Sequence, residues 1–224
     1  MKINPNASVR VESTGVAPVL YIDNFYADPD AVRSEALKAN YDLSVAFYPG
    51  RHAPLASERY AQAARVISTV ATRLGDRRYN PEDFRSDFSI VTTRPDDLLP
   101  SQAHPHIDPT PVLGLVYLTP DSREGTSFYY SEYLGTSVIT SPEQLARHTE
   151  FLQSRGDEFA PVGYNLDGHA IWRRLYTIEP IYNRFVMYPG NAFHAVDIKH
   201  VDDEIDMTRV RITQRFIVEA TYEK

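Results

Sequence analysis

Two histidines and an aspartate lie close together in the stretch HPHID, from His104 to Asp108. Side chains alternate in direction along an extended strand, so His106 and Asp108 point the same way, and His104 shares their parity. A further imidazole, His194, follows a predicted strand and a PGN turn in RFVMYPGNAFHAVD. Two imidazoles and one carboxylate on neighbouring strands form the facial triad that suits Fe(II). We therefore predict that His106, Asp108 and His194 bind a catalytic metal ion.

The same stretch allows a simpler interpretation, in which His106 caps a turn and Asp108 begins a loop. The chain contains no cysteine, so any metal must be held by nitrogen and oxygen, and a structural zinc site is disfavoured. We do not assign the other histidines to the metal. His104 is either a second-shell or entrance residue or a surface histidine, His148 is expected on a solvated helix face, and His52, His169 and His200 are expected in loops.

Strands must position these residues, and the chain has many runs rich in Val, Ile, Thr, Tyr and Phe between turn residues. The runs span residues 84–94, 112–118, 125–131, 171–178, 184–190, 192–198 and 208–220. A short strand is also predicted at Val19–Ile22. Strands at this density, with helices mainly near the N-terminus, favour a mainly β fold with flanking helices and a double-stranded β-helix (jelly-roll or cupin-like) core.

Three helices are predicted from their end signals and apolar periodicity. The predicted N-caps are Asp28, which precedes Pro29; Ser57, whose helix ends at Gly75; and Ser141, which has capping-box spacing to Gln144. We interpret residues 1–224 as a single domain, in which 1–80 form an N-terminal helical support and 84–219 form the jelly-roll core. The irregular segment at about 131–168 is interpreted as an insertion that serves as a lid. The stretch YPGRHAP, residues 48–54, is expected to be a compact turn.

Composition narrows the classes of partner. The 224 residues are 42% hydrophobic and 24% charged, with a formal net charge of -7 and no basic stripe, which argues against nucleic acid. The N-terminus lacks the apolar core of a signal peptide, and nowhere do 18 apolar residues run together. We therefore expect a cytoplasmic protein that acts on a small-molecule or peptide substrate, without a membrane partner. An oligomer is possible but is not readable from the sequence.

In the order of its motifs, the chain resembles the 2-oxoglutarate and Fe(II)-dependent dioxygenase superfamily, and within it the prolyl-4-hydroxylase-like branch. After the His-x-Asp pair, the elements LVYLTP, EGTSFYY, RFVMYPGNAFHAV and TRVRITQRFIVE follow in the order that such enzymes show. The resemblance covers roughly residues 88–219. The details AHPHID and YNRFVMYPGNAFH look like a poorly characterised bacterial subgroup. Thr119 replaces the asparagine of the Tyr-Leu-Asn element and Glu124 replaces a usual glycine, which puts the loop after that strand in doubt.

The resemblance implies Fe(II), 2-oxoglutarate as cosubstrate, and O2. The distal carboxylate of 2-oxoglutarate then needs a cation, preferably an arginine fork, after His194. In TRVRITQRFIVE, the odd positions Arg209, Arg211, Thr213 and Arg215 share one strand face, whereas the other face is mainly apolar. The resemblance favours Arg211 with Thr213 as the carboxylate site, Arg209 as the reserve and Tyr117 as a hydroxyl donor. Arg215 is equally well explained as a structural ion pair.

The implied activity is oxidation, most simply hydroxylation, of an amino acid or of a peptidyl or carrier-bound amino-acid side chain. Halogenating relatives replace the carboxylate at the position of Asp108 with a small residue, so the aspartate favours hydroxylation, while desaturation and cyclisation remain open. Two alternatives also remain. One is a cupin-like metalloenzyme that does not use 2-oxoglutarate, and the other is a non-catalytic jelly-roll protein that binds a ligand.

Overall fold

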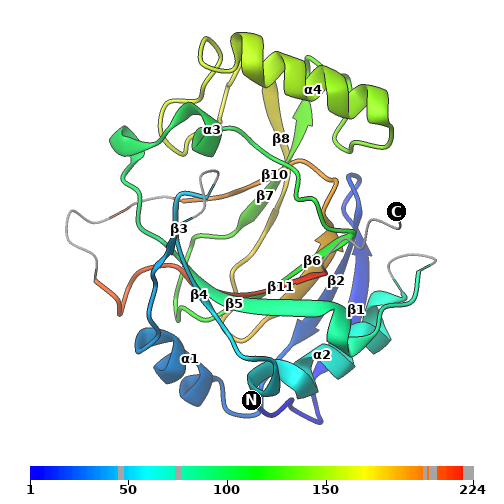
Figure 1. The fold of residues 1–224 in the computed structure, drawn as a ribbon, viewed down its shortest axis with the longest axis vertical. Coiled ribbons are helices and arrows are strands. Elements are labelled where there is room, and N and C mark those ends of the chain that lie inside the picture. The colour runs from blue at the N-terminus through cyan, green and yellow to red at the C-terminus, as the bar shows by residue number, and fades with distance from the viewer. Residues whose placement is uncertain (45–47, 74–76, 199–200, 202–205, 219–224) are drawn as a thin grey trace.

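Two antiparallel β-sheets lie face to face, with helices on their outer sides (Figure 1). The structure is a computed structural model that describes residues 1–44, 48–73, 77–198, 201 and 206–218. Every strand pair formed by these residues is antiparallel. The mainly β architecture with flanking helices is therefore confirmed.

The larger sheet has the strand order β1-β2-β9-β6-β11-β5-β4-β3. Its strands span Ser8–Ser13 (β1), Pro18–Asp23 (β2), Leu43–Ser44 (β3), Gly50–Pro54 (β4), Phe84–Val91 (β5), Val112–Tyr117 (β6), Phe185–Pro189 (β9) and Ile212–Val218 (β11). The smaller sheet has the order β10-β7-β8. Its strands span Thr126–Ser131 (β7), Trp172–Ile178 (β8) and His194–Val196 (β10).

Helices α1 (Pro29–Leu37) and α2 (Ser57–Ala71) cover the outer face of the larger sheet, below it in Figure 1. The predicted cap of α1 is confirmed, because the Asp28 side chain accepts a hydrogen bond from the Ala31 amide. The cap of α2 differs by one residue: Ala56 is the N-cap and makes no side-chain hydrogen bond. The predicted end of this helix at Gly75 lies outside the described residues.

Helix α4 (Pro142–Arg155) packs on the outer face of the smaller sheet, at the top of Figure 1. The Ser141 hydroxyl accepts from the Gln144 amide at 3.3 Å, as the capping-box spacing predicts. The return bond differs, because the Gln144 side chain accepts from the Thr140 amide at 2.8 Å instead of from Ser141. The short helix α3 (Pro100–Ala103) precedes the HPHID stretch, and two 3-10 turns span Pro81–Asp83 and Pro95–Asp97.

The N-terminal 80 residues contribute strands β1 to β4 as well as α1 and α2. The prediction of a compact turn at residues 48–54 is wrong, because Gly50–Pro54 form strand β4 and pair with β5. His52 was expected in a loop, but it lies on this strand opposite Ser89 and is fully buried. The sequence pattern missed the strand because Pro49 and Gly50 at its start are turn residues and alternation is weak over five residues.

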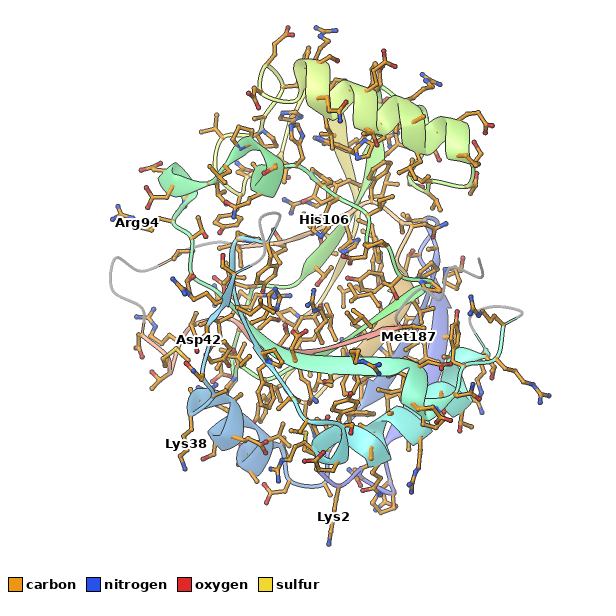
Figure 2. The ribbon with its side chains drawn as sticks, in the orientation of Figure 1. Lys2, Lys38, Asp42, Arg94, His106 and Met187 are labelled. Carbon is orange, nitrogen blue, oxygen red and sulfur yellow. The ribbon has the colours of Figure 1, made fainter. Side chains whose placement is uncertain are left out.

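Apolar side chains between the two sheets form a core that leaves one part of the interior open. Tyr21, Leu113 and Val186 from the larger sheet meet Phe128 and Ile178 from the smaller sheet. Figure 2 shows His106 near the middle of the molecule. It lies between α4 and the larger sheet, which is marked there by Met187 of β9. Within the described residues, no helix has the length and apolar character that crossing a membrane requires.

Candidate metal centre and cosubstrate pocket

The HPHID stretch runs beside the turn that connects β9 to β10, and backbone hydrogen bonds fix it there. The amides of His106 and His194 each donate to the carbonyl of the other residue at 2.9 Å, and the Asp108 amide donates to the Gly190 carbonyl at 2.8 Å. A Cβ atom at Gly190 would lie 2.2 Å from the Thr110 carbonyl oxygen, so only glycine allows this close approach. The PGN turn therefore holds the distal histidine against the His-x-Asp pair.

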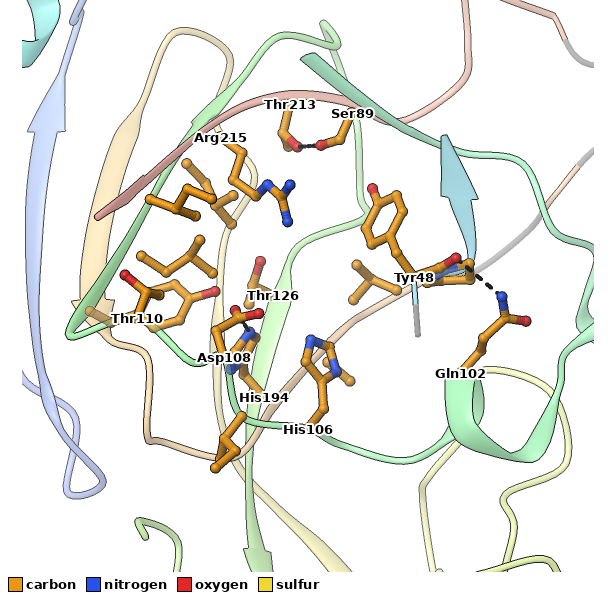
Figure 3. Close-up of a pocket in the computed structure, with 18 of the residues that line it drawn as sticks. Tyr48, Ser89, Gln102, His106, Asp108, Thr110, Thr126, His194, Thr213 and Arg215 are labelled. Carbon is orange, nitrogen blue, oxygen red and sulfur yellow. Dashed lines mark hydrogen bonds and ion pairs between the residues drawn. The ribbon is translucent and has the colours of Figure 1, made fainter. Parts of the chain in front are cut away.

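Three ligand atoms, one each from His106, Asp108 and His194, lie within 4.8 Å of one another (Figure 3). The structure thus brings together the residues that were predicted to bind a metal. His194 Nε2 lies 3.1 Å from Asp108 Oδ2. Two donors at right angles, each about 2.1 Å from one ion, are about 3.0 Å apart. This edge therefore has the length expected for adjacent ligands of an octahedral ion.

The hydrogen bonding of His194 also fits a cation at this position. Its Nδ1 lies 2.9 Å from the Ala192 carbonyl oxygen, which only accepts, so Nδ1 carries the proton. In a neutral ring, the lone pair of Nε2 would face a carboxylate oxygen of Asp108. Two such acceptors at 3.1 Å require a proton or a metal ion between them. A histidine whose second nitrogen donates to a carbonyl is the usual arrangement of a metal ligand.

The pKa shifts in the cluster leave its donors ready for a metal. Burial, together with the neighbouring His194, lowers the pKa of His106 to about 4, so this imidazole is neutral at pH 7. Burial alone would raise the pKa of Asp108, but the hydrogen bond with His194 and the nearby histidines hold it well below its usual value. A neutral imidazole and an ionised carboxylate are the forms that coordinate metals.

A cavity of about 980 Å³ opens beside these three residues, between the two sheets. Strand β11 forms one wall, and its residues alternate as predicted. Ile212 and Phe216 pack in the core under α1 and α2, whereas Arg211, Thr213 and Arg215 line the cavity. The predicted inward face of the last strand is therefore confirmed for these positions. Arg209 lies outside the strand, exposed in the preceding turn, and does not line the cavity.

Arg211 is only 3% exposed, and no carboxylate among the described residues pairs with it. Its Nε donates to the Glu124 carbonyl at 2.9 Å, while Nη2 makes two long contacts, to the Gly125 carbonyl at 3.5 Å and to Thr126 Oγ1 at 3.4 Å. The guanidinium also lies 5.7 Å from the ring centre of Tyr117. A buried cation without a counter-charge is costly, so this geometry favours an anion in the cavity.

Hydroxyl groups surround this arginine. Tyr117 Oη and Thr126 Oγ1 are 2.9 Å apart, and Thr213 Oγ1 lies 2.7 Å from Ser89 Oγ. Tyr117 and Thr213 lie opposite each other in the β6–β11 register, which places the predicted cosubstrate residues in one neighbourhood. Ser89 and Thr126 were not singled out from the sequence. The only signal for them was strand parity, which does not show which neighbouring strand is adjacent.

Arg215 differs from Arg211 because its charge is compensated. Its Nη2 lies 2.8 Å from Asp87 Oδ2 on β5, directly opposite in the register, and His52 Nδ1 lies 3.1 Å from Asp87 Oδ1 (the Arg215 side chain is seen in Figure 3). The structural ion pair that the sequence left open is thus present. Asp87 was missed because ion-pair partners on adjacent strands depend on the strand order.

Two histidines lie where the sequence did not place them. His104 is 2% exposed: its Nε2 donates to the Gly156 carbonyl at 2.8 Å, and its Nδ1 accepts from Trp172 Nε1 at 3.0 Å. It therefore connects the HPHID stretch to β8 and to the end of α4. The prediction that His148 lies on a solvated helix face is wrong, because this residue is 5% exposed and lines the cavity. It faces inward beside Phe151, and the polar residues around it in the sequence concealed that orientation.

Comparison with known proteins places the chain in a family. Residues 4–217 match the Family of unknown function DUF6445. The chain belongs to the DUF6445 family. No protein with curated annotation matches this DUF6445 chain in sequence. Its fold resembles that of HygX, the first of the solved structures described below.

HygX from Streptomyces hygroscopicus, solved with nickel and 2-oxoglutarate bound, is 15% identical with a TM-score of 0.50, and the match covers 90% of this chain and 83% of HygX. The carbocyclase SnoK from nogalamycin biosynthesis is 13% identical with a TM-score of 0.47, over 89% and 78% of the two chains. A Pseudomonas putida prolyl-4-hydroxylase is 10% identical with a TM-score of 0.44, over 89% and 91%. At these identities the likeness concerns the fold alone.

Proposed function

We propose that this DUF6445 protein is a non-haem Fe(II) and 2-oxoglutarate-dependent oxygenase. Its two sheets would form the double-stranded β-helix, and residues 1–224 would act as a single domain. The proposed reaction is hydroxylation of an amino acid or of a peptidyl or carrier-bound amino-acid side chain. His106, Asp108 and His194 would hold Fe(II), because their donor types, spacing and protonation suit that ion.

The observation that carries the proposal is the uncompensated charge of Arg211 in the same cavity as the three donors. A metalloenzyme without an anionic cosubstrate would gain nothing from a buried guanidinium, whereas 2-oxoglutarate needs a cation for its distal carboxylate. In this assignment Arg211 takes that carboxylate, Thr213 and Thr126 would offer hydroxyl groups from the cavity wall, and Tyr117 would act through its hydrogen bond with Thr126. Arg209 has no part in it.

When bound, Fe(II) and 2-oxoglutarate would supply the oxidising chemistry, in which O2 converts 2-oxoglutarate to succinate and carbon dioxide and adds one oxygen atom to the substrate. The protein residues would bind, orient and enclose. The Ala192 carbonyl fixes the His194 ring, and Asp87 fixes Arg215 beside the metal ligands. The carboxylate of Asp108 would occupy the position that halide takes in halogenating relatives, which favours hydroxylation over halogenation.

Succinate formation in air tests this proposal. The wild-type protein should convert 2-oxoglutarate to succinate only when Fe(II) is added, and His194→Ala should abolish the conversion. His169→Ala is the matched control, because this histidine lies away from the cavity and should leave the rate unchanged. Absence of succinate with the wild-type protein, or an equal rate in His194→Ala, would contradict the assignment.

A further inference from the structure

The cavity has a second half, away from Arg211, whose wall comes from α3, α4 and the segment 161–168. Gln102, Ile107, His148, Leu152, Tyr164 and Leu166 line it. Most of these side chains are apolar, and α4 supplies His148 and Leu152 to this wall. The segment predicted to be a lid therefore contributes the wall on which a primary substrate would lie beside the metal ligands.

This half offers no free charge to a substrate. Among the described lining residues, the charged side chains are Asp108 of the metal cluster, Arg215 of β11 and Arg211, which directly precedes β11. Arg215 is neutralised by Asp87, and in the proposed function Arg211 is taken by 2-oxoglutarate. A free amino acid would bring a carboxylate and an ammonium group into this space with no ionic partner for either. Burying unpaired charges is strongly unfavourable.

His148 is a polar side chain of this half of the cavity that has no role in the proposed function. It is 5% exposed and lines the cavity, and no hydrogen bond joins its imidazole to a residue that the structure describes. The rings of Phe193, at 4.9 Å, and Trp172, at 6.4 Å, hold it in place. Gln102 differs, because its amide already bonds the Tyr48 carbonyl and the Leu99 amide. A buried polar group without a partner favours a ligand that supplies one.

We propose that His148 is a specificity-determining residue that hydrogen-bonds a neutral polar group of the primary substrate, whose apolar side chain packs against Leu152 and Leu166. The substrate class is then an apolar amino-acid side chain presented on an amide scaffold, as in a peptide or an acylated residue, and not a free zwitterionic amino acid. This inference rests on the proposed function for the occupancy of Arg211. It narrows the substrates that the proposed function allows.

Matched pairs of ligands test the inference directly by calorimetry. N-acetyl-L-leucinamide is compared with L-leucine, and N-acetyl-L-phenylalaninamide with L-phenylalanine, because each pair shares one side chain and the capped member carries neutral amides in place of the ammonium and carboxylate groups. The fluorescence of Trp172, the single tryptophan, reports whether binding occurs beside His148. Titrations are made with the metal-free protein and, anaerobically, with the protein supplied with Fe(II) and 2-oxoglutarate.

At least one amide should bind with a fluorescence change and at least about tenfold more tightly than its free amino acid. His148→Phe, which keeps a ring but removes the hydrogen bond, should weaken that binding about 5- to 10-fold, and His148→Gln should restore it. The control is Leu145→Ala on the 44% exposed face of α4, which should change nothing.

In the protein supplied with Fe(II) and 2-oxoglutarate, equal binding of the free amino acids overturns the inference, as does an unchanged affinity in His148→Phe or the absence of saturable binding by both amides. The proposed function fails separately. If the amides bind as expected but no succinate forms with Fe(II) and 2-oxoglutarate, the substrate pocket stands and the oxygenase assignment does not.

Discussion

Replacing Arg211 with methionine should abolish tight binding of 2-oxoglutarate while leaving Fe(II) binding intact. Methionine keeps most of the length and apolar volume of the side chain but removes a buried guanidinium that has no carboxylate partner among the described residues. The metal ligands come from the HPHID stretch and β10, and none of them contacts Arg211 through a hydrogen bond that the structure shows. The two binding events should therefore separate in this variant.

The size of the effect follows from the donors that Arg211 has available. Its Nη2 contacts are long, at 3.4 and 3.5 Å, and its Nη1 makes no hydrogen bond with a described residue, so two N–H groups can turn to a carboxylate. A hydrogen bond to a charged group contributes about 1.5–3 kcal/mol, which gives about 3–6 kcal/mol for two. The hydroxyls of Thr126 and Tyr117 remain, so the lower end applies. About 3 kcal/mol corresponds to a roughly 150-fold rise in Kd.

Anaerobic calorimetry measures this rise, with 2-oxoglutarate titrated into protein that is saturated with Fe(II). Arg209→Met provides the control, because this arginine is exposed and lies outside the cavity lining. The wild type and the control should bind alike, and Arg211→Met should bind at least about 100-fold more weakly. An Arg211→Met protein with wild-type affinity, or an equal loss in Arg209→Met, would refute the assignment of the carboxylate site.

Three further predictions concern the metal ligands, the ion pair and the buried histidine. Asp108→Ala and His194→Ala should each weaken Fe(II) binding by more than about 100-fold in a competition titration against a chelator, since even residues that only orient ligands change affinity 10- to 100-fold; near wild-type affinity in either would exclude it as a ligand. Arg215→Met leaves Asp87 buried without its cation, and it should lower the free energy of unfolding, measured in urea, by about 2–4 kcal/mol. The double variant with Asp87→Leu should recover much of this loss. Additive losses in the two single variants would count against the ion pair. Burial and the neighbouring His104 lower the pKa of His148 to about 4 in the folded protein, below its ordinary 6.5. The unfolded chain therefore binds the proton first, and the free energy of unfolding falls as pH falls from about 6.5 to about 4. His148→Phe should remove about 2–3 kcal/mol of that loss, and an acid dependence identical to that of the wild type would show that His148 does not cause it.

The parts of the site that depend on local pattern were predictable from the sequence. The alternation in TRVRITQRFIVE predicted that Arg211 and Arg215 face the cavity and that Ile212 and Phe216 pack under the helices. The parity of His106 and Asp108 predicted that they act together, and the N-caps at Asp28 and Ser141 were correct. Each of these features follows from side-chain periodicity or from a hydrogen bond within four residues.

The parts that depend on which strands become neighbours were not predictable in the same way. Asp87 pairs with Arg215 across 128 residues, and Ser89 meets Thr213 across 124 residues, because β5 lies beside β11. Arg147 and Glu150 lie close to His148 in the sequence of α4, whereas the residues that bury it are Phe193 and Trp172. Tertiary packing outweighs the polar pattern of that helix.

Anaerobic absorption spectroscopy of the wild-type protein tests the central claim most directly. Fe(II) is added first and 2-oxoglutarate second, and the visible charge-transfer band of the iron-bound cosubstrate is recorded. The account predicts that the band appears with the wild type and is lost in His194→Ala. No band with the wild type, or an unchanged band in His194→Ala, would contradict the claim that His106, Asp108 and His194 form an Fe(II) site that accepts 2-oxoglutarate.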